Sequence, residues 1–215
     1  MRIVFYGRLG DKVNMVSVVA IGCHPDDVEF GCFGTLALYR KRKADVRVLL
    51  LTGGEKGGNK EVRLQAAKSA CSLIGATLSY AGFEDGKLSD NWETVSWIEK
   101  ELKKAKADIV YVICPSDSHE DHRNGGKAGI SASRYVKNVL LYETASAKGF
   151  KPQIYVDITE TLEEKVKALL MHKPDRKREH ASEAVRCLAT YRAYELRQPG
   201  KAIEAFQVVK WEHIP

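Results

Sequence analysis

Hydrophobic residues along the chain form short continuous runs, and segments with helical periodicity separate these runs. Continuous apolar runs of this length are typical of strands that are buried on both faces of a sheet. The predicted strands cover residues 16–21, 46–51, 77–81, 108–114, 139–143, 154–158 and 205–209. The segments between them predict helices over 34–43, 60–74, 92–106, 127–135, 161–172 and 178–196.

Two of the predicted helices carry signals at their ends. Gly75 follows the helix over 60–74 directly, and glycine is the residue that most often ends a helix. Thr161 and Glu164 have the spacing of a capping box, in which each side chain accepts a hydrogen bond from a free backbone N–H. We therefore expect Thr161 to cap the helix that follows it.

Strands that alternate with helices predict parallel βαβ units. The expected fold is α/β, with a single Rossmann-like, doubly wound, mostly parallel sheet and flanking helices over residues 16–215. The sequence contains no internal repeat, long linker or low-complexity tract. Residues 1–15 precede the first clear strand, and we expect an N-terminal extension or an extra strand there.

The composition excludes several classes of protein. The chain has 215 residues, of which 44% are hydrophobic, and no apolar run approaches the roughly 20 residues of a membrane helix. No signal peptide is visible, so the expected location is cytoplasmic, without a membrane span. The five cysteines lack CxxC spacing, which argues against a disulfide framework.

The net charge of +6 comes from short basic clusters on predicted helices. A nucleic-acid-binding surface needs a continuous basic stripe with stacking aromatic residues, and none is present. A small anionic substrate is therefore favoured over nucleic acid as the partner. The sequence leaves open whether the chain forms a homo-oligomer.

Polar residues gather after two of the predicted strands. The first cluster, residues 23–29, reads Cys-His-Pro-Asp-Asp-Val-Glu, and the second, residues 116–122, reads Ser-Asp-Ser-His-Glu-Asp-His. In a doubly wound sheet, ligands bind at the carboxyl ends of the strands, at the point where the strand order reverses. If the strands before the two clusters are neighbours at that point, residues about a hundred positions apart converge on one pocket.

The residue types in these clusters suit a catalytic metal. Zinc binds imidazole and carboxylate groups, and a catalytic site uses three protein ligands with one open position for water. Asp26 and Asp27 are adjacent, and in a turn we expect their side chains to project in different directions. One of them can bind the metal while the other acts as a general base on water. Each cluster alone is also compatible with a capping or packing role.

The first cluster resembles the signature of the PIG-L/LmbE family of N-acetylglucosaminyl deacetylases, in the segment 24–36, HPDDVEFGCFGTL. The resemblance continues through residues 51–57, 83–88, 119–124, 165–173 and 204–206, so it spans nearly the whole chain. It implies that His24, Asp27 and His122 bind zinc and that Asp26 is the general base. It also implies that His119 stabilises the oxyanion or donates a proton.

The resemblance implies further roles around this centre. Asp121 would orient a neighbouring histidine, and Arg63 and Asp85 would lie where the family contacts the sugar. His172, in a C-terminal motif, is assigned to substrate binding, although packing at a helix end is equally compatible with its position. Two positions depart from the family pattern, because Ala66 stands where a glutamate is common and Lys-Pro-Asp follows His172.

These observations predict a zinc-dependent N-deacetylase that hydrolyses the acetamide of an N-acetylglucosamine-type amino sugar, or of a related small molecule, and releases acetate. Another divalent metal remains open. One alternative is a metal-dependent amidohydrolase that acts on a different amide. A second is a non-catalytic protein that binds a metal or a small ligand, in which case Asp26 and His119 would have no chemical task.

Overall fold

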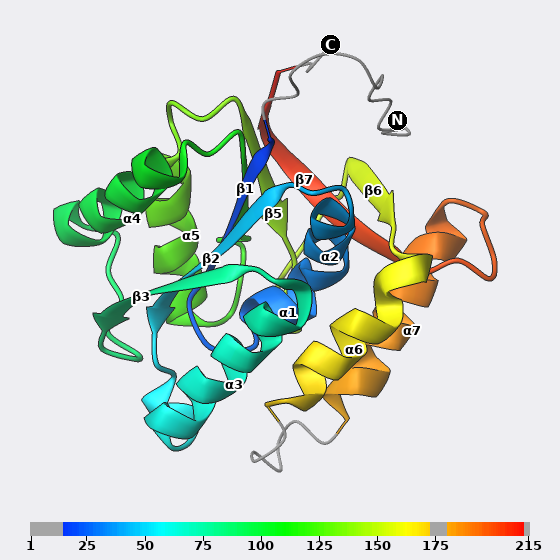
Figure 1. The fold of residues 1–215 in the computed structure, drawn as a ribbon, viewed down its shortest axis with the longest axis horizontal. Helices are drawn as coiled ribbons and strands as arrows, with labels where there is room; N and C mark the ends of the chain where they lie inside the picture. Colours follow the sequence, from blue (N-terminus) through cyan, green and yellow to red (C-terminus); the bar gives the residue numbers. More distant parts are fainter. Residues whose placement is uncertain (1–14, 173–179, 213–215) are drawn as a thin grey trace.

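The computed structural model describes residues 15–172 and 180–212, and these residues form a seven-stranded sheet with helices on both faces (Figure 1). The strands are β1 (Ser17–Gly22), β2 (Asp45–Thr52), β3 (Thr77–Phe83), β4 (Ile109–Ile113), β5 (Asn138–Tyr142), β6 (Ile154–Asp157) and β7 (Ile203–Trp211). The helices are α1 (Asp27–Gly31), α2 (Phe33–Lys41), α3 (Lys60–Ile74), α4 (Trp92–Ala105), α5 (Glu120–Ala132), α6 (Leu162–Leu170) and α7 (Ala181–Glu195). Two short 3₁₀ segments, η1 (Glu55–Gly57) and η2 (Thr159–Thr161), complete the set.

The strand order is β3-β2-β1-β4-β5-β7-β6. The first five strands in this order run parallel, and β7 is antiparallel to both of its neighbours. The chain winds outward from β1 to β3 and returns across β1 to β4, so β1 and β4 are neighbours where the order reverses. The expected α/β fold with a doubly wound, mostly parallel sheet is confirmed.

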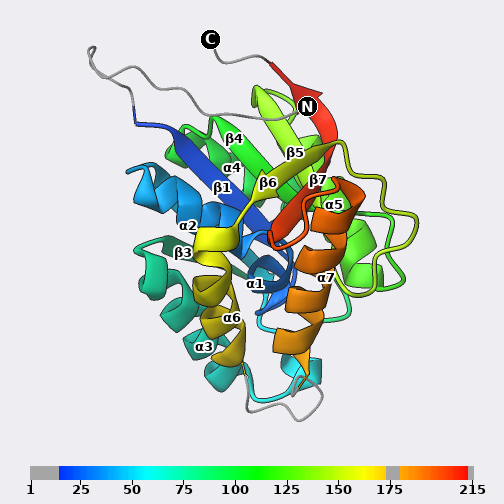
Figure 2. The same ribbon diagram turned by 90° about the vertical axis from the view of Figure 1, so that its right-hand side faces the viewer.

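Helices cover the two faces unequally. Helices α4 and α5 lie together on one face, while α2 and α3 lie on the other (Figures 1 and 2). Helix α6 packs against α1, α2 and α3, and α7 packs against α6 and β7. The core is the central sheet itself, because β1, β4 and β5 are buried along their whole length. The continuous apolar runs in the sequence therefore correspond to strands covered on both sides.

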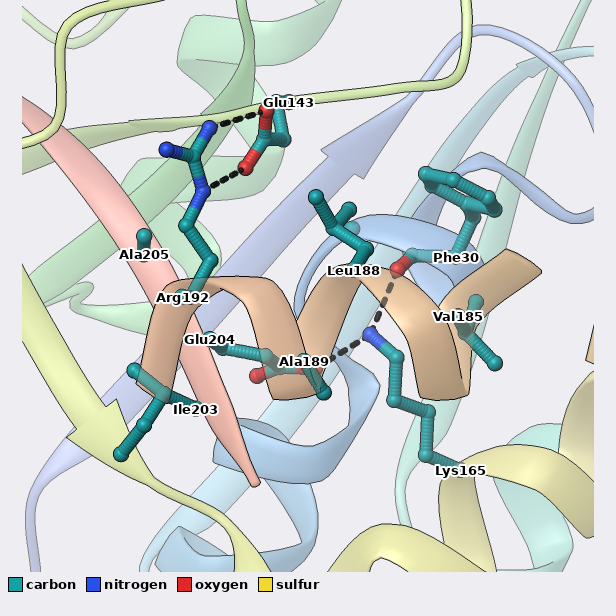
Figure 3. A pocket seen from close by; sticks show the side chains of 11 residues that line it. Phe30, Glu143, Lys165, Val185, Leu188, Ala189, Arg192, Ile203, Glu204 and Ala205 are labelled. Atoms are coloured by element: carbon teal, nitrogen blue, oxygen red, sulfur yellow. Dashed lines mark hydrogen bonds and ion pairs between the residues drawn. The ribbon is translucent and has the colours of Figure 1, made fainter. Parts of the chain in front are cut away.

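A buried ion pair between two C-terminal elements, with its hydrogen bonds, joins these elements to the rest of the molecule (Figure 3). The Lys165 ammonium of α6 donates to Glu204 on β7 and to the carbonyl oxygen of Phe30. The Glu204 carboxylate also accepts from two backbone N–H groups at the start of α2, those of Gly34 and Thr35. The space beside this network is only about 10 Å³, enough for one water at most, so it is a packing defect and not a ligand site.

Some expected boundaries were wrong. Helix α5 begins at Glu120, seven residues before the predicted start at Lys127, and this places His122 in its first turn. The capping box at Thr161 does not form, because the Thr161 hydroxyl donates to the carbonyl oxygen of Gly34 instead of accepting from its own helix. Helix α7 is described from Ala181, and residues 1–14 of the predicted extension lie outside the described residues.

Candidate metal centre and active site

The two polar clusters lie at the carboxyl ends of β1 and β4, on neighbouring strands. They line one cavity of about 340 Å³, a volume within the range of small-molecule sites. Its described lining consists of His24, Asp26, Asp27, Lys56, Gly57, Arg63, Asp85, Gly86, His119, Glu120 and His122. The structure thus brings seven of the nine predicted site residues to the cavity wall, with Asp121 buried behind it and His172 elsewhere.

A tight turn after β1 holds the first part of the site. The Asp27 carboxylate accepts hydrogen bonds from the backbone N–H groups of Cys23 (2.9 Å) and His24 (2.7 Å), which ties the turn together. Asp26, the residue just before α1, has a φ of 111° and a ψ of −19°. A positive φ is uncommon and strained for a residue other than glycine, and such strain concentrates at functional sites.

Three side chains point their ligand atoms at one another. His24 Nδ1 lies 3.2 Å from His122 Nε2, and His122 Nε2 lies 3.3 Å from an oxygen of Asp27. The other Asp27 oxygen lies 3.6 Å from His24 Nδ1. Two ligands placed about 2.0–2.1 Å from a tetrahedral zinc ion are separated by roughly 3.3–3.4 Å. The separations among the three residues therefore fit a tetrahedral metal ion.

The opposite side of the His24 ring is also engaged. Its Nε2 lies 3.1 Å from Asp121 Oδ2 and 3.0 Å from Asp85 Oδ1. Because both partners are acceptors, Nε2 carries a hydrogen, and Nδ1 is the nitrogen that would bind a metal ion together with the other two candidate ligands once its own proton is displaced. Asp121 is fully buried and also accepts from the backbone N–H groups of Gly86 (2.7 Å) and Leu88 (3.1 Å).

His122 is oriented by a residue that the sequence did not single out. Its Nδ1 lies 3.0 Å from Asp117 Oδ2, so Nε2 is left to face the other candidate ligands. Asp117 also accepts from the Thr144 hydroxyl (2.6 Å) and from the backbone N–H of His119 (2.8 Å). Its position directly after a buried strand was the only signal in the sequence, and nothing there indicated Thr144.

The carboxylates dominate the electrostatics of this cluster. Burial lowers the pKa of His24, but hydrogen bonds to Asp121 and Asp27 outweigh burial and raise it to about 10. Burial likewise lowers the pKa of His122, and the charge of Asp27 with the hydrogen bond to Asp117 raises it to about 10. Burial also acts to raise the pKa of Asp27, but the charge of His122 brings it well below its usual value. Buried negative charge of this density attracts a cation, so the donor set suits a divalent metal.

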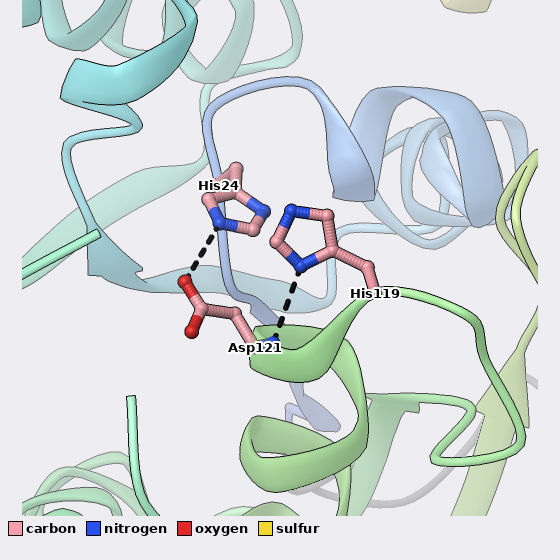
Figure 4. A group of neighbouring side chains, drawn as sticks. All are labelled: His24, His119 and Asp121. Carbon is pink, nitrogen blue, oxygen red and sulfur yellow. Dashed lines mark hydrogen bonds and ion pairs between the residues drawn. The ribbon is translucent and has the colours of Figure 1, made fainter. Parts of the chain in front are cut away.

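His119 lies above both histidines, with ring centroids 4.8 Å from His24 and 4.7 Å from His122. Its Nδ1 accepts from the backbone N–H of Asp121 at 3.2 Å, which also caps the start of α5 (Figure 4). Since Nδ1 is an acceptor, Nε2 carries the hydrogen. Ligand atoms of His24, His119 and Asp121 also lie within 4.8 Å of one another. In this second group, however, Asp121 Oδ2 already contacts His24 Nε2, and His119 Nδ1 already accepts from the backbone N–H of Asp121.

The remaining predicted residues differ in how they meet the cavity. The buried Arg63 guanidinium donates to the carbonyl oxygens of Gly54 and Pro25 and lies 3.6 Å from Asp26. Asp85 lines the cavity, yet both of its oxygens contact protein groups, which makes it a partner of His24 as well as a candidate sugar contact. His172 is buried, with Nε2 3.3 Å from Glu29, and is not among the residues that line the cavity. A substrate contact by His172 stays a prediction.

The comparisons with known proteins identify the family. The family described as PIG-L, GlcNAc-PI de-N-acetylase, matches residues 19–133, more than half of the chain. The chain belongs to the PIG-L family. The match includes both polar clusters and every candidate metal ligand.

Two curated relatives of this PIG-L protein are deacetylases by name. The uncharacterized deacetylase YaiS of Escherichia coli K12 is 29% identical over 166 residues, which cover 73% of this chain and 90% of YaiS. The diacetylchitobiose deacetylase of Thermococcus kodakarensis is 29% identical over 193 residues, covering 77% of this chain and 72% of that protein. The PIG-L protein is accordingly a hydrolase of the deacetylase class, which acts on amide bonds.

Solved structures share its fold. The conserved protein TT1542 of Thermus thermophilus superposes with a TM-score of 0.83 at 24% identity, covering 94% of this chain and 98% of TT1542. GalB of Pseudomonas putida KT2440, a 4-carboxy-2-hydroxymuconate hydratase, superposes with a TM-score of 0.82 at 16% identity, covering 94% and 99%. The fold therefore carries more than one reaction, and the reaction has to be argued from the site.

None of the described helices of this PIG-L protein is long and apolar enough to cross a membrane. The expected cytoplasmic location, the absence of a nucleic-acid partner and the oligomeric state stay predictions.

Proposed function

We propose that this protein is a zinc-dependent N-deacetylase that hydrolyses the acetamide of an N-acetylglucosamine-type amino sugar and releases acetate. One observation carries the proposal: His24 Nδ1, His122 Nε2 and the two oxygens of the Asp27 carboxylate approach one another at 3.2–3.6 Å, in the wall of the same cavity as Asp26 and His119. The names of the deacetylase relatives support the reaction class.

The metal ion has a defined place in this proposal. His24 Nδ1, His122 Nε2 and the Asp27 carboxylate would hold it, and the open side of the site faces the cavity. When bound, such an ion polarises a carbonyl group and lowers the pKa of water. Two nitrogens and one oxygen are a common donor set for catalytic zinc, which is the metal we propose.

Asp26 is the general base in this proposal. Its carboxylate lines the cavity beside the candidate ligands and lies 3.6 Å from the Arg63 guanidinium. Asp26 has a positive φ, whereas an oxygen of the adjacent Asp27 is tied back to the turn by two backbone N–H groups. Asp26 accepts a proton as water adds to the amide carbon, and that proton passes to the nitrogen when the C–N bond breaks.

His119 stabilises the charge that develops on the carbonyl oxygen. Its Nδ1 is fixed by the backbone of α5, so Nε2–H is the group that can donate toward the cavity. A donor whose hydrogen bond strengthens as the oxygen becomes negative lowers the barrier selectively. A protein that only binds a ligand has no need of a strained base and a fixed donor beside the metal ligands.

The test measures acetate and amine release from N-acetylglucosamine and from N,N′-diacetylchitobiose, with zinc and with a chelator. Asp26→Asn should retain zinc and lose about 10²–10⁴ in kcat. His119→Asn is a matched variant, because asparagine still caps α5 but does not reproduce the Nε2 donor, so zinc content should stay and kcat should fall. Full activity of the zinc-free protein, or full activity of both variants, would refute the proposal. If acetate were released only from other acetamides, the substrate would have to be reassigned, but the proposed hydrolytic mechanism would stand.

A further inference from the structure

Lys56 is a cationic residue of the cavity lining that the proposed chemistry does not use. It lies in η1, and its backbone N–H donates to Asp85 Oδ2 at 2.8 Å. The backbone N–H of Asp85 in turn donates to Glu55 at 3.0 Å. These two hydrogen bonds lock η1 to the loop after β3, and Asp85 also contacts His24. The backbone of Lys56 is therefore held at a fixed place relative to the metal site.

The side chain of Lys56 follows the cavity wall. Its Nζ and the last two carbons of its side chain pack over Gly86, where an added Cβ would overlap the ammonium group. Gly86 has a φ of 75°, a conformation that favours glycine, and its N–H donates to Asp121. The absence of a side chain at residue 86 thus leaves the room in which the Lys56 ammonium lies.

Other charged groups of the cavity are engaged within the protein. Arg63 donates to two backbone carbonyl oxygens. Asp27 and Asp85 contact the histidines and backbone N–H groups, and Glu120 lies 3.9 Å from a histidine ring nitrogen. For Lys56, no carboxylate lies within 4.0 Å of Nζ among residues 15–172 and 180–212. Its positive charge is available to a ligand in the cavity.

We propose that Lys56 is a specificity-determining residue and that the sugar substrate carries an anionic group, a phosphate or a carboxylate, which Lys56 binds. The proposal rests on the deacetylase function proposed above and narrows its substrate class. A lysine ammonium is a compact point charge that pairs well with phosphate or carboxylate oxygens. The net charge of +6 adds a long-range attraction for anions.

The experiment compares kcat/KM for neutral N-acetylglucosamine with kcat/KM for its 1-phosphate, its 6-phosphate and N-acetylmuramic acid. The zinc-loaded wild type should prefer at least one anionic sugar about tenfold or more, chiefly through KM. Lys56→Met should reduce this preference to near one, and Lys56→Arg should restore part of it. Lys87→Met is the matched control, because Lys87 is exposed on the adjoining loop and pairs with Glu84 at 2.8 Å. It should keep the wild-type preference.

The outcomes separate this inference from the proposed function. No anionic preference in the wild type, or a preference that survives in Lys56→Met, overturns the role of Lys56 while acetate release still supports the deacetylase. If no sugar releases acetate, the deacetylase proposal fails, and calorimetric binding of the same sugars then tests Lys56 alone. Anion-dependent affinity that Lys56→Met abolishes supports the inference, whereas equal affinities, or no binding of any anionic sugar, overturn it.

Discussion

Asp121→Asn tests whether the carboxylate behind His24 supports the metal site. The Asp121 side chain is fully buried, and its partners are all donors: Gly86 N–H at 2.7 Å, Leu88 N–H at 3.1 Å and His24 Nε2–H at 3.1 Å. An asparagine offers one acceptor oxygen, and its NH₂ group must face at least one of these donors. The variant therefore loses charge-assisted hydrogen bonds and gains a buried donor without an acceptor.

The magnitude follows from these contacts. Loss of a charged hydrogen bond together with an unsatisfied donor costs about 2–4 kcal/mol in the free energy of unfolding. For a chain of this size that corresponds to a melting temperature lower by about 4–16 °C. The His24 ring also loses the anionic partner that fixes its tautomer, so zinc affinity should fall about 10–100-fold. The loss of stability is smaller than the total stability of a typical domain, so the variant should still fold.

Chelator competition measures the zinc affinity, and calorimetry measures the melting temperature of the metal-free protein. Asp108→Asn is the matched control, because the Asp108 carboxylate accepts from the backbone N–H of Ser17 (2.8 Å) at the opposite end of β4 from the site, and an asparagine oxygen can keep that hydrogen bond. Its melting temperature should fall less. If Asp121→Asn bound zinc as tightly as the wild type and melted within about 1 °C of it, the reasoning would be refuted.

Three further substitutions test the packing around the site. Gly31→Ala would drive a methyl group into the fixed, fully buried ring of Tyr142 and should cost about 1–3 kcal/mol by denaturant unfolding; an unchanged midpoint would contradict this. Lys165→Met leaves the Glu204 charge buried without its cation and should cost about 3–5 kcal/mol, and a more stable variant would reverse the conclusion. Thr144→Val removes the hydroxyl that donates to Asp117, the carboxylate that orients His122, and should weaken zinc binding by up to about tenfold. A chelator titration identical to that of the wild type would disprove this.

Much of the fold could be predicted because its strands are buried on both faces. The run at 108–114 is apolar without interruption after its first residue, and β4 is buried throughout. Helix α3 spans the predicted residues 60–74, with Gly75 at a φ of 69° as expected for its end. The start of α5 was not predictable in this way, because its first turns are polar and contain Gly125 and Gly126, so no apolar period marks them. These two glycines are needed for close packing, Gly125 against the Cys23 sulfur and Gly126 against the carbonyl oxygen of Ile113.

The candidate ligands could be predicted because they cluster at strand ends, whereas their supports could not. Asp85 and Asp121 reach His24 from positions 61 and 97 residues away, and no local pattern encodes such contacts. Thr144 lies in an irregular loop and meets Asp117 only through the tertiary structure. The Thr161 prediction failed for the same reason, because a tertiary acceptor on Gly34 competes with the local cap.

The separation of His24 and His122 along the chain has a consequence for folding. The two residues are 98 positions apart, and they follow β1 and β4, the neighbouring strands at the reversal in strand order. A metal ion held by both would join the chain like a removable cross-link, and closing a loop of about 100 residues in the unfolded chain is worth about 4–5 kcal/mol when the link is permanent. An ion that stays on one of these residues in the unfolded chain would not close the loop, so it would stabilise the protein through binding to both histidines, and only once β1 and β4 are adjacent. Metal binding would then indicate that β1 and β4 have paired in the centre of the sheet. A truncated chain that ends before β4 would be unable to retain the ion.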